Sequence, residues 1–280
     1  MKTTYWRRRV MDWIGTAFMI LATMVALVPL ISLVAYVGAK GFPALSWHFF
    51  TQLPKSVGES GGGIANAIVG SMTLVGLAML FGLPVGLLAG IYLAEHGRGW
   101  FANGIRFGIE VLSGVPSIVV GVFVYTVAVL PVRHFSAWAG GIALAMIMIP
   151  TITRSTEEML KMVPNTLREA GLALGAPQWR VTWDIVLRSA APGILTGVML
   201  AVARAAGETA PLLFTAFGNR FWQQGLDQPI ASLPVQIFTY AISPYDDWHA
   251  KAWGGALVLI GLILVTNLIA RVYSTWRTGR

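Results

Sequence analysis

The sequence has no cysteine and little charge. Without a cysteine among its 280 residues, disulfide bonds, thiolate catalysis and cysteine-bound metal are excluded. Charged residues make up 11% of the chain and hydrophobic residues 56%. Several apolar runs reach about twenty residues, the length that crosses the hydrocarbon core of a bilayer, whereas the short alternating segments of a transmembrane barrel are absent. We therefore expect an all-α polytopic membrane protein.

Motifs of catalysis are also missing. The sequence has no Gly-x-x-x-x-Gly-Lys-Ser/Thr loop, so it does not hydrolyse ATP by the mechanism that such a loop supports. Its four histidines are His48, His96, His134 and His249. They fall in loops or at helix edges, and none is spaced with a serine or with carboxylates in a catalytic or metal-binding pattern. We predict a non-catalytic chain without a metal site.

Six apolar segments are expected to cross the membrane within a single transmembrane domain, 1–280. They are residues 13–37, 64–93, 107–130, 135–153, 190–217 and 254–270. The first follows a cluster of basic residues, but it is longer than a signal peptide and lacks an A-x-A cleavage site. We interpret it as an additional N-terminal helix ahead of a core that covers 64–272. A short helix is also expected over 233–241, in the long segment before the last crossing.

Glycine and proline distinguish two of these segments. Gly82, Gly86 and Gly90 recur at spacing four, which predicts a smooth face for the close approach of another helix. The spacing does not identify that helix. Pro116 removes a backbone hydrogen bond within 107–130. That segment is either a broken helix that lines a pathway or a helix with a packing kink.

The formal net charge of +8 comes from basic residues in the loops. Six crossings place both termini on one side of the membrane. That side then carries 14 lysines and arginines against 5 on the other, with Arg204 inside the membrane. The positive-inside rule places the termini and a loop at 154–189 in the cytoplasm. Topology thus explains the basic balance better than nucleic-acid binding, and membrane lipid is the expected surrounding.

Residues 165–192 form the longest amphipathic stretch of the chain. Asn165 follows a proline and is the expected N-cap of a first short helix, while Gly175 and Pro177 form a stop signal. A second short helix is expected to begin near Gln178. Two short helices with a break between them predict a cytoplasmic docking element.

Arg204 and Glu208 lie in the middle of the fifth apolar segment. An arginine at the bilayer centre costs about 2.5–3.5 kcal/mol on insertion scales. The two residues are spaced i,i+4 with the cation first, which is the weaker orientation for a pair within a helix. Pro211 also removes the hydrogen bond to the carbonyl of Gly207. These features favour part of a solute path over an ion pair that is only structural.

The chemistry of this pair favours an oxyanion as the solute. A guanidinium presents a fork of donors that matches two oxygens at once. A neighbouring carboxylate repels a fully deprotonated anion such as sulfate, but it accepts a hydrogen bond from an anion that still carries a proton, such as phosphate. Phosphate is therefore favoured, with sulfate, molybdate or another oxyanion as the alternative.

The amphipathic stretch resembles a known motif. Glu169-Ala170-Gly171, followed by Gly175 and by Ile185-x-Leu187, is similar to the EAA loop of the permease subunits of bacterial ABC importers. Gly171 stands where a second alanine is usual, and Arg188 where proline often closes the motif. Four further stretches resemble the permease subunits of phosphate importers specifically: residues 62–70, 114–121, 204–212 and 231–236. The resemblance covers about residues 60–272.

This resemblance implies a type-I ABC importer permease fold with a cytoplasmic coupling helix, in the bacterial inner membrane. The residues implied in coupling to an ATPase are Glu169, Ala170, Gly171 and Gly175. Those implied in the substrate pathway are Arg204, Glu208, Thr209 and, on the cytoplasmic side, Arg154. The implied partners are a second homologous permease subunit, an ATPase dimer and an extracytoplasmic phosphate-binding protein. ATP and Mg belong to the ATPase, and no cofactor is implied in this chain.

Two other classes of function agree less well with the sequence. An ion-coupled secondary transporter is disfavoured by the single intramembrane ion pair, by the lack of a detectable internal repeat and by the docking loop. A membrane-embedded hydrolase would need a catalytic triad or a metal cluster. The sequence predicts a non-catalytic permease subunit of an ATP-driven phosphate importer.

Overall fold

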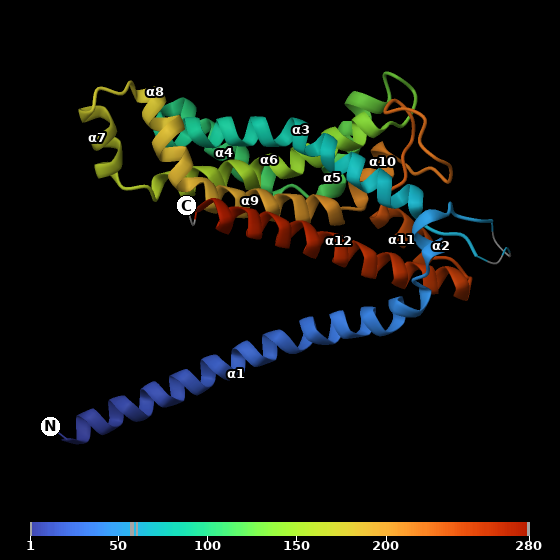
Figure 1. Cartoon of the computed structure of the whole chain (residues 1–280), viewed down its shortest axis with the longest axis horizontal. Helices are drawn as coiled ribbons and strands as arrows, with labels where there is room; N and C mark the ends of the chain where they lie inside the picture. The colour runs from blue at the N-terminus through green and yellow to red at the C-terminus, as the bar shows by residue number, and fades with distance from the viewer. Residues whose placement is uncertain (1, 57–58, 60, 279–280) are drawn as a thin grey trace.

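The computed structural model describes residues 2–56, 59 and 61–278, and within them all regular structure is helical (Figure 1). The helices are α1 (Lys2–Gly41), η1 (Phe42–Ala44), α2 (Trp47–Thr51), α3 (Ala65–Glu95), α4 (Trp100–Gly114), α5 (Ser117–Val124), η2 (Tyr125–Val129), α6 (Ala137–Lys161), α7 (Asn165–Ala173), α8 (Gln178–Arg180), η3 (Val181–Val186), α9 (Leu187–Gly207), α10 (Ala210–Thr215), α11 (Leu233–Ala241) and α12 (Asp246–Thr278). In the described chain, five spans are long and apolar enough to cross a membrane, and α4 with α5 makes a sixth if the bent pair counts as one. The predicted all-α polytopic class is confirmed.

The closest helix packing joins α3 and α6. A Cβ built on Gly86 would lie 2.8 Å from the Cβ of Ile152, and one on Gly90 would lie 2.5 Å from the Cβ of Thr156. Both distances are too short for a real side chain, so the two backbones approach closely only because these residues are glycines. The predicted glycine face is confirmed, and its partner is a helix of the same chain.

The main core lies where α3, α6 and α9 meet. Leu74 of α3, Met148 and Ile152 of α6 and Ala201 of α9 are buried there. Lipid tails are as apolar as these side chains, so van der Waals packing, more than the hydrophobic effect, holds such helices together in a bilayer. The α3–α6–α9 unit is therefore the most closely packed part of the molecule.

Helix α1 stands apart from this core (Figure 1). Its most apolar stretch of 18 residues has a mean hydropathy of 2.5, yet none of the residues in that stretch is buried. Contact with the rest of the chain comes at its last turns, where the rings of Tyr36 and Trp253 lie 5.2 Å apart and Gly41 meets the backbone of Trp253. The additional N-terminal helix is present, and it extends beyond the predicted 13–37.

The predicted third span, 107–130, is a broken helix. Helix α4 ends at Gly114, α5 begins at Ser117, and the two are bent by 103°. The cause is Pro116, which forces the preceding residue out of helical geometry. Val115 accordingly has the extended angles φ −70° and ψ 129°. Of the two interpretations left open by the sequence, the broken helix is correct.

The predicted loop 154–189 is largely helical. Helix α6 continues past Thr153 to Lys161, because Thr156, Glu157 and Leu160 are still buried against neighbouring helices. The second short helix is not separate either. The chain is helical from Gln178 to Gly207, through the π-helical turn η3. The segment outside the long helices is therefore 162–177, and α7 is its one helix.

The bundle has two ends, named here after the short helices they carry. The α7 end also holds the last residues of α3 and α6 and the described residues nearest to both termini (Figure 1). The α11 end holds α2, α10 and the loop 216–232 (Figure 1). Helix α11 spans Leu233–Ala241, as the sequence predicts. Six spans, with the bent pair α4–α5 counted as one, would account for both termini lying at the same end.

Candidate functional site

The expected fifth span, 190–217, is interrupted beside its two charges. Helix α9 ends at Gly207, and Glu208 has the extended angles φ −72° and ψ 125°. Helix α10 then begins at Ala210 with Pro211 in its first turn. Proline has no N–H for the carbonyl four residues earlier, and its ring clashes with that carbonyl, which favours a break in the helix at this point. Their spacing predicted that Arg204 and Glu208 share one face of a continuous helix. This prediction is wrong, because the helix ends between them.

The ion pair nevertheless forms across this break. Arg204 Nε lies 3.7 Å from Glu208 Oε1. The side chain of Glu208 is 16% exposed, whereas that of Arg204 is 52% exposed. The carboxylate is thus shielded by the chain, while much of the guanidinium faces space that the chain leaves open.

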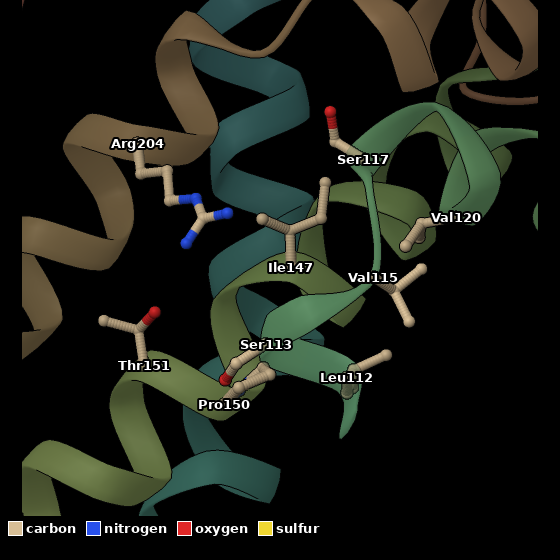
Figure 2. Close-up of a pocket in the computed structure, with 9 residues that line it drawn as sticks. All are labelled: Leu112, Ser113, Val115, Ser117, Val120, Ile147, Pro150, Thr151 and Arg204. Atoms are coloured by element: carbon tan, nitrogen blue, oxygen red, sulfur yellow. The ribbon is translucent and has the colours of Figure 1, made fainter. Parts of the chain in front are cut away.

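Arg204 points into a small cavity opposite the α4–α5 break (Figure 2). The other lining residues are Leu112, Ser113, Val115, Ser117, Val120, Ile147, Pro150 and Thr151. They come from α4, from the link to α5, from α5 and from α6. The α4–α5 break therefore faces the cavity into which Arg204 points, and three hydroxyl groups line that cavity together with the guanidinium.

Helix α5 reaches this position because it packs on α10. A Cβ on Gly121 would lie 2.6 Å from the Cα of Pro211. Any larger residue at 121 would separate the two short helices. The same proline that ends α9 is thus the contact that brings the α4–α5 break alongside it.

Of the predicted pathway residues, Arg204 lines this cavity, and Glu208 is linked to it through the ion pair without being a lining residue. The structure does not bring the other two into the cavity. Thr209 lines a separate, mostly apolar pocket between α1, α11 and α12, together with Gly207 and Trp253. Arg154 lies one turn beyond Thr151 on α6, and its Nε is 3.3 Å from Glu158 Oε1. Arg154 borders a second pocket nearer the α7 end, which residues of α4 also line.

The four residues implied in coupling lie on or directly after α7. Glu169 and Ala170 are exposed, whereas Gly171 is buried against Val181 and Ile185 of η3. Gly175 ends the helix with φ +80°, a left-handed angle that glycine adopts without strain. The predicted stop is thereby confirmed. Pro164 is the N-cap and the predicted cap, Asn165, is the first helical residue.

Sequence reasoning missed Thr151 as a site residue and gave the cavity serines no role toward a solute. A usable signal existed for Thr151, because it precedes Arg154 by one helical turn and follows Pro150. The sequence also gave no hint of two buried ion-pair groups near the α7 end, Glu95 with Arg168 and Arg106 with Glu157. Their members are too far apart in the chain for any periodicity to reveal them.

A family model for the binding-protein-dependent transport system inner membrane component matches residues 82–278. The chain belongs to this family. The match begins within α3 and takes in the glycine face, both helix breaks, α7 and Arg204. Helix α1 lies outside it.

Several relatives share a more specific name, "Phosphate transport system permease protein PstA". The protein of Yersinia pestis is 51% identical over 234 residues, which cover 83% of this chain and 79% of that protein. The protein of Haemophilus influenzae is 50% identical over 84% of this chain and 83% of its own length. The Mycobacterium leprae protein is 38% identical over 98% of this chain and 92% of its own length. The predicted resemblance to phosphate-importer permeases is confirmed.

A solved structure supports the fold. A chain of the MetNI methionine ABC transporter, in an inward-facing conformation, superimposes with a TM-score of 0.58 over 76% of this chain and 93% of that chain. The two are 20% identical, so the likeness concerns the fold and not the solute. The predicted ABC importer permease fold is confirmed.

Proposed function

We propose that this chain is the membrane-spanning permease subunit of an ATP-driven phosphate importer and forms half of its translocation pathway. The observation that carries the proposal is the Arg204–Glu208 pair, placed at a helix break and opened toward a cavity that a second broken helix faces. Discontinuous helices at a polar site within the membrane are typical of transport pathways. Relatives of up to 51% identity carry the name of a phosphate permease.

The arrangement of the pair suits phosphate in particular. Glu208 meets the guanidinium through Nε, and the remainder of the guanidinium points into the cavity (Figure 2). Its fork of donors can bind two oxygens of one anion. Glu208 then accepts a hydrogen bond from an anion that still carries a proton, which phosphate does at neutral pH and sulfate does not.

The remaining pathway residues have narrower roles in this proposal. Ser113, Ser117 and Thr151 supply hydroxyl groups to the anion in the cavity. Arg154 meets the anion one helical turn later, on its way toward the α7 end. Thr209 contributes to the helix break and does not contact the solute, because it lines the apolar pocket on the other side.

Transport also requires a motor, which this proposal assigns to a partner. Helix α7 exposes Leu167 and Leu172, and Leu174, directly after the helix, is 89% exposed. Exposed leucines grouped in one short segment suit a protein groove. We assign α7 to docking on a cytoplasmic ATPase dimer, which binds ATP and Mg, with Glu169, Ala170, Gly171 and Gly175 shaping the helix. The chain itself is then non-catalytic, and the charge asymmetry of its loops places the α7 end and both termini in the cytoplasm.

A second permease subunit completes the pathway. Arg204 is half exposed in the isolated chain, and an arginine in that position needs water or protein around it within the membrane. The neighbouring face of α5 exposes Ile118, Val119, Val122 and Phe123. A homologous subunit covers this face, and an extracytoplasmic phosphate-binding protein delivers the anion at the α11 end.

The test is reconstitution of the gently purified complex in liposomes with the phosphate-binding protein. ATP is expected to drive the uptake of labelled phosphate, and a tenfold excess of sulfate or molybdate is expected to leave that uptake unchanged. Uptake of sulfate or molybdate in place of phosphate would assign another oxyanion. Transport by the chain without an ATPase would indicate a secondary transporter instead.

A further inference from the structure

A buried ion pair attaches α7 to the end of α3. Arg168 comes from α7, and Glu95 is the last residue of α3. A guanidinium nitrogen of Arg168 meets Oε1 of Glu95, and the side chains of the two residues are 19% and 7% exposed. Since a glutamate at a helix C-terminus faces the negative end of the helix dipole, Glu95 is unfavourable for α3 alone. Its carboxylate is stabilised there by the cation from α7.

Two further helices meet at this pair. Arg168 Nη2 donates a hydrogen bond of 2.8 Å to the carbonyl of Leu160, in the last turn of α6. The hydroxyl of Thr182, in η3, lies 3.5 Å from Glu95 Oε2. The pair thus joins α7 to α3, to α6 and to the start of the helical run that leads to Arg204.

The rest of α7 is attached only along one side. Gly171 packs on Val181 and Ile185, which belong to η3. The leucines of α7 face outward, and the helix is bounded by Pro164 and by the left-handed Gly175. A displacement of α7 would therefore reach η3 by packing and α6 also along the short link 162–164, whereas it reaches α3 through Arg168.

We propose that the Glu95–Arg168 pair is a mechanical clamp that makes α7 move as one body with α3 and α6. Those two helices are closely packed through Gly86 and Gly90, and α6 borders the Arg204 cavity through Thr151. Movement imposed on α7 is thereby transmitted to the wall of the cavity that α6 forms, while η3 leads directly into α9, which carries Arg204. The inference rests on the proposed function. Glu95 and Arg168 are positioning residues that touch neither the solute nor the nucleotide.

The clamp is tested in the complete importer, reconstituted in liposomes, by measuring labelled phosphate uptake and ATP hydrolysis in the same sample. In Glu95→Gln and Arg168→Gln, phosphate taken up per ATP hydrolysed is expected to fall roughly tenfold, within the range of coupling energies between distant sites. ATP hydrolysis and co-purification of the ATPase are expected to persist. Arg168→Lys keeps the cation and is expected to retain most of the coupling.

The decisive variant is the double substitution Glu95→Gln with Arg168→Gln. It leaves no unpaired charge buried, so it is expected to assemble even where the single variants do not. It is nevertheless expected to remain uncoupled, because two neutral amides form a weaker contact. The matched control is Asp247→Asn, which breaks the 3.7 Å pair with Lys251 on α12, far from α7, and should change neither readout.

Two results would overturn the clamp. One is a double variant that takes up phosphate per ATP as the unmodified importer does. The other is a double variant that fails to assemble, because the pair would then serve folding alone. If the unmodified complex shows no ATP-driven phosphate uptake, the proposed function fails, independently of the clamp.

Discussion

Two of the arginine–glutamate pairs in the described chain differ in nearly every respect except composition. Arg204 and Glu208 are four residues apart, with an exposed arginine (52%) and an atom separation of 3.7 Å. Glu95 and Arg168 are 73 residues apart and almost fully enclosed. The enclosed pair has further protein partners, the carbonyl of Leu160 and the hydroxyl of Thr182, whereas the guanidinium of the open pair points into a cavity. We infer that a charge in an apolar chain is a candidate solute site when some of its hydrogen-bonding capacity remains unused, as for Arg204.

The largest expected difference between the pairs is in stability. Removing one charge of an enclosed pair leaves the other buried alone, so Glu95→Gln should lower the free energy of unfolding by about 3–5 kcal/mol. Glu208→Gln should lower it by less than about 1 kcal/mol, because Arg204 remains partly solvated. Thermal unfolding of the purified chain in detergent measures both. Equal destabilisation would remove the distinction between the pairs.

The next effect concerns transport. Arg204→Ala removes hydrogen bonds to a charged ligand, each of which contributes about 1.5–3 kcal/mol, so phosphate uptake should fall roughly tenfold to a hundredfold. The assembled complex should remain intact, because the side chain is not buried. Uptake of labelled phosphate, together with the subunit ratio after purification, checks this. Unaltered uptake would show that the open pair is not part of the pathway.

A smaller change tests the geometry of the open pair. Arg204→Lys keeps the charge but loses the fork of donors, so uptake should fall several-fold while remaining above that of Arg204→Ala. The loss should appear mainly as a higher phosphate concentration for half-maximal uptake. If lysine supports the same uptake as arginine, the site uses only the positive charge, and the fork of donors does not bind two oxygens of the anion.

The smallest effect is expected at the cavity wall. Thr151→Val removes one hydroxyl, and a single neutral hydrogen bond contributes about 0.5–1.5 kcal/mol, so uptake should fall roughly twofold to tenfold. The matched control is Thr73→Val on α3, where the hydroxyl donates to the carbonyl of Val69 in its own helix. A loss of the same size in both variants would indicate a general effect of the substitution and no role for the cavity.

Local sequence signals anticipated much of the fold. The glycine face of α3 is where spacing placed it, and Gly175 ends α7 with the left-handed angle that a glycine stop signal implies. The Pro116 break follows from the missing N–H of proline and from the restriction on the residue before it. Each of these depends on covalent or steric properties of a few neighbouring residues, which do not change with tertiary context.

The sequence was less informative where polarity and burial disagree. The charged residues around 154–161 suggested a loop, but Glu157 is enclosed by Arg106 and Lys161, and α6 continues. The i,i+4 spacing of Arg204 and Glu208 suggested one helix face, but α9 ends at Gly207, between the two residues, and Glu208 is extended. The family resemblance of residues 204–212 grouped Thr209 with the charges, but in the structure it lines a pocket beside α1 and α12.

Composition and periodicity alone established an all-helical membrane chain with a charged pair at mid-membrane and a basic terminal side, because bilayer thickness and the burial of charge act on any sequence in the same way. Only the packed structure decided which pair opens on a cavity and which one is enclosed. That decision depends on contacts between residues far apart in the chain, such as Gly121 on Pro211 and Arg168 on Glu95. Such contacts arise when helices pack against each other, and a local sequence pattern does not contain them.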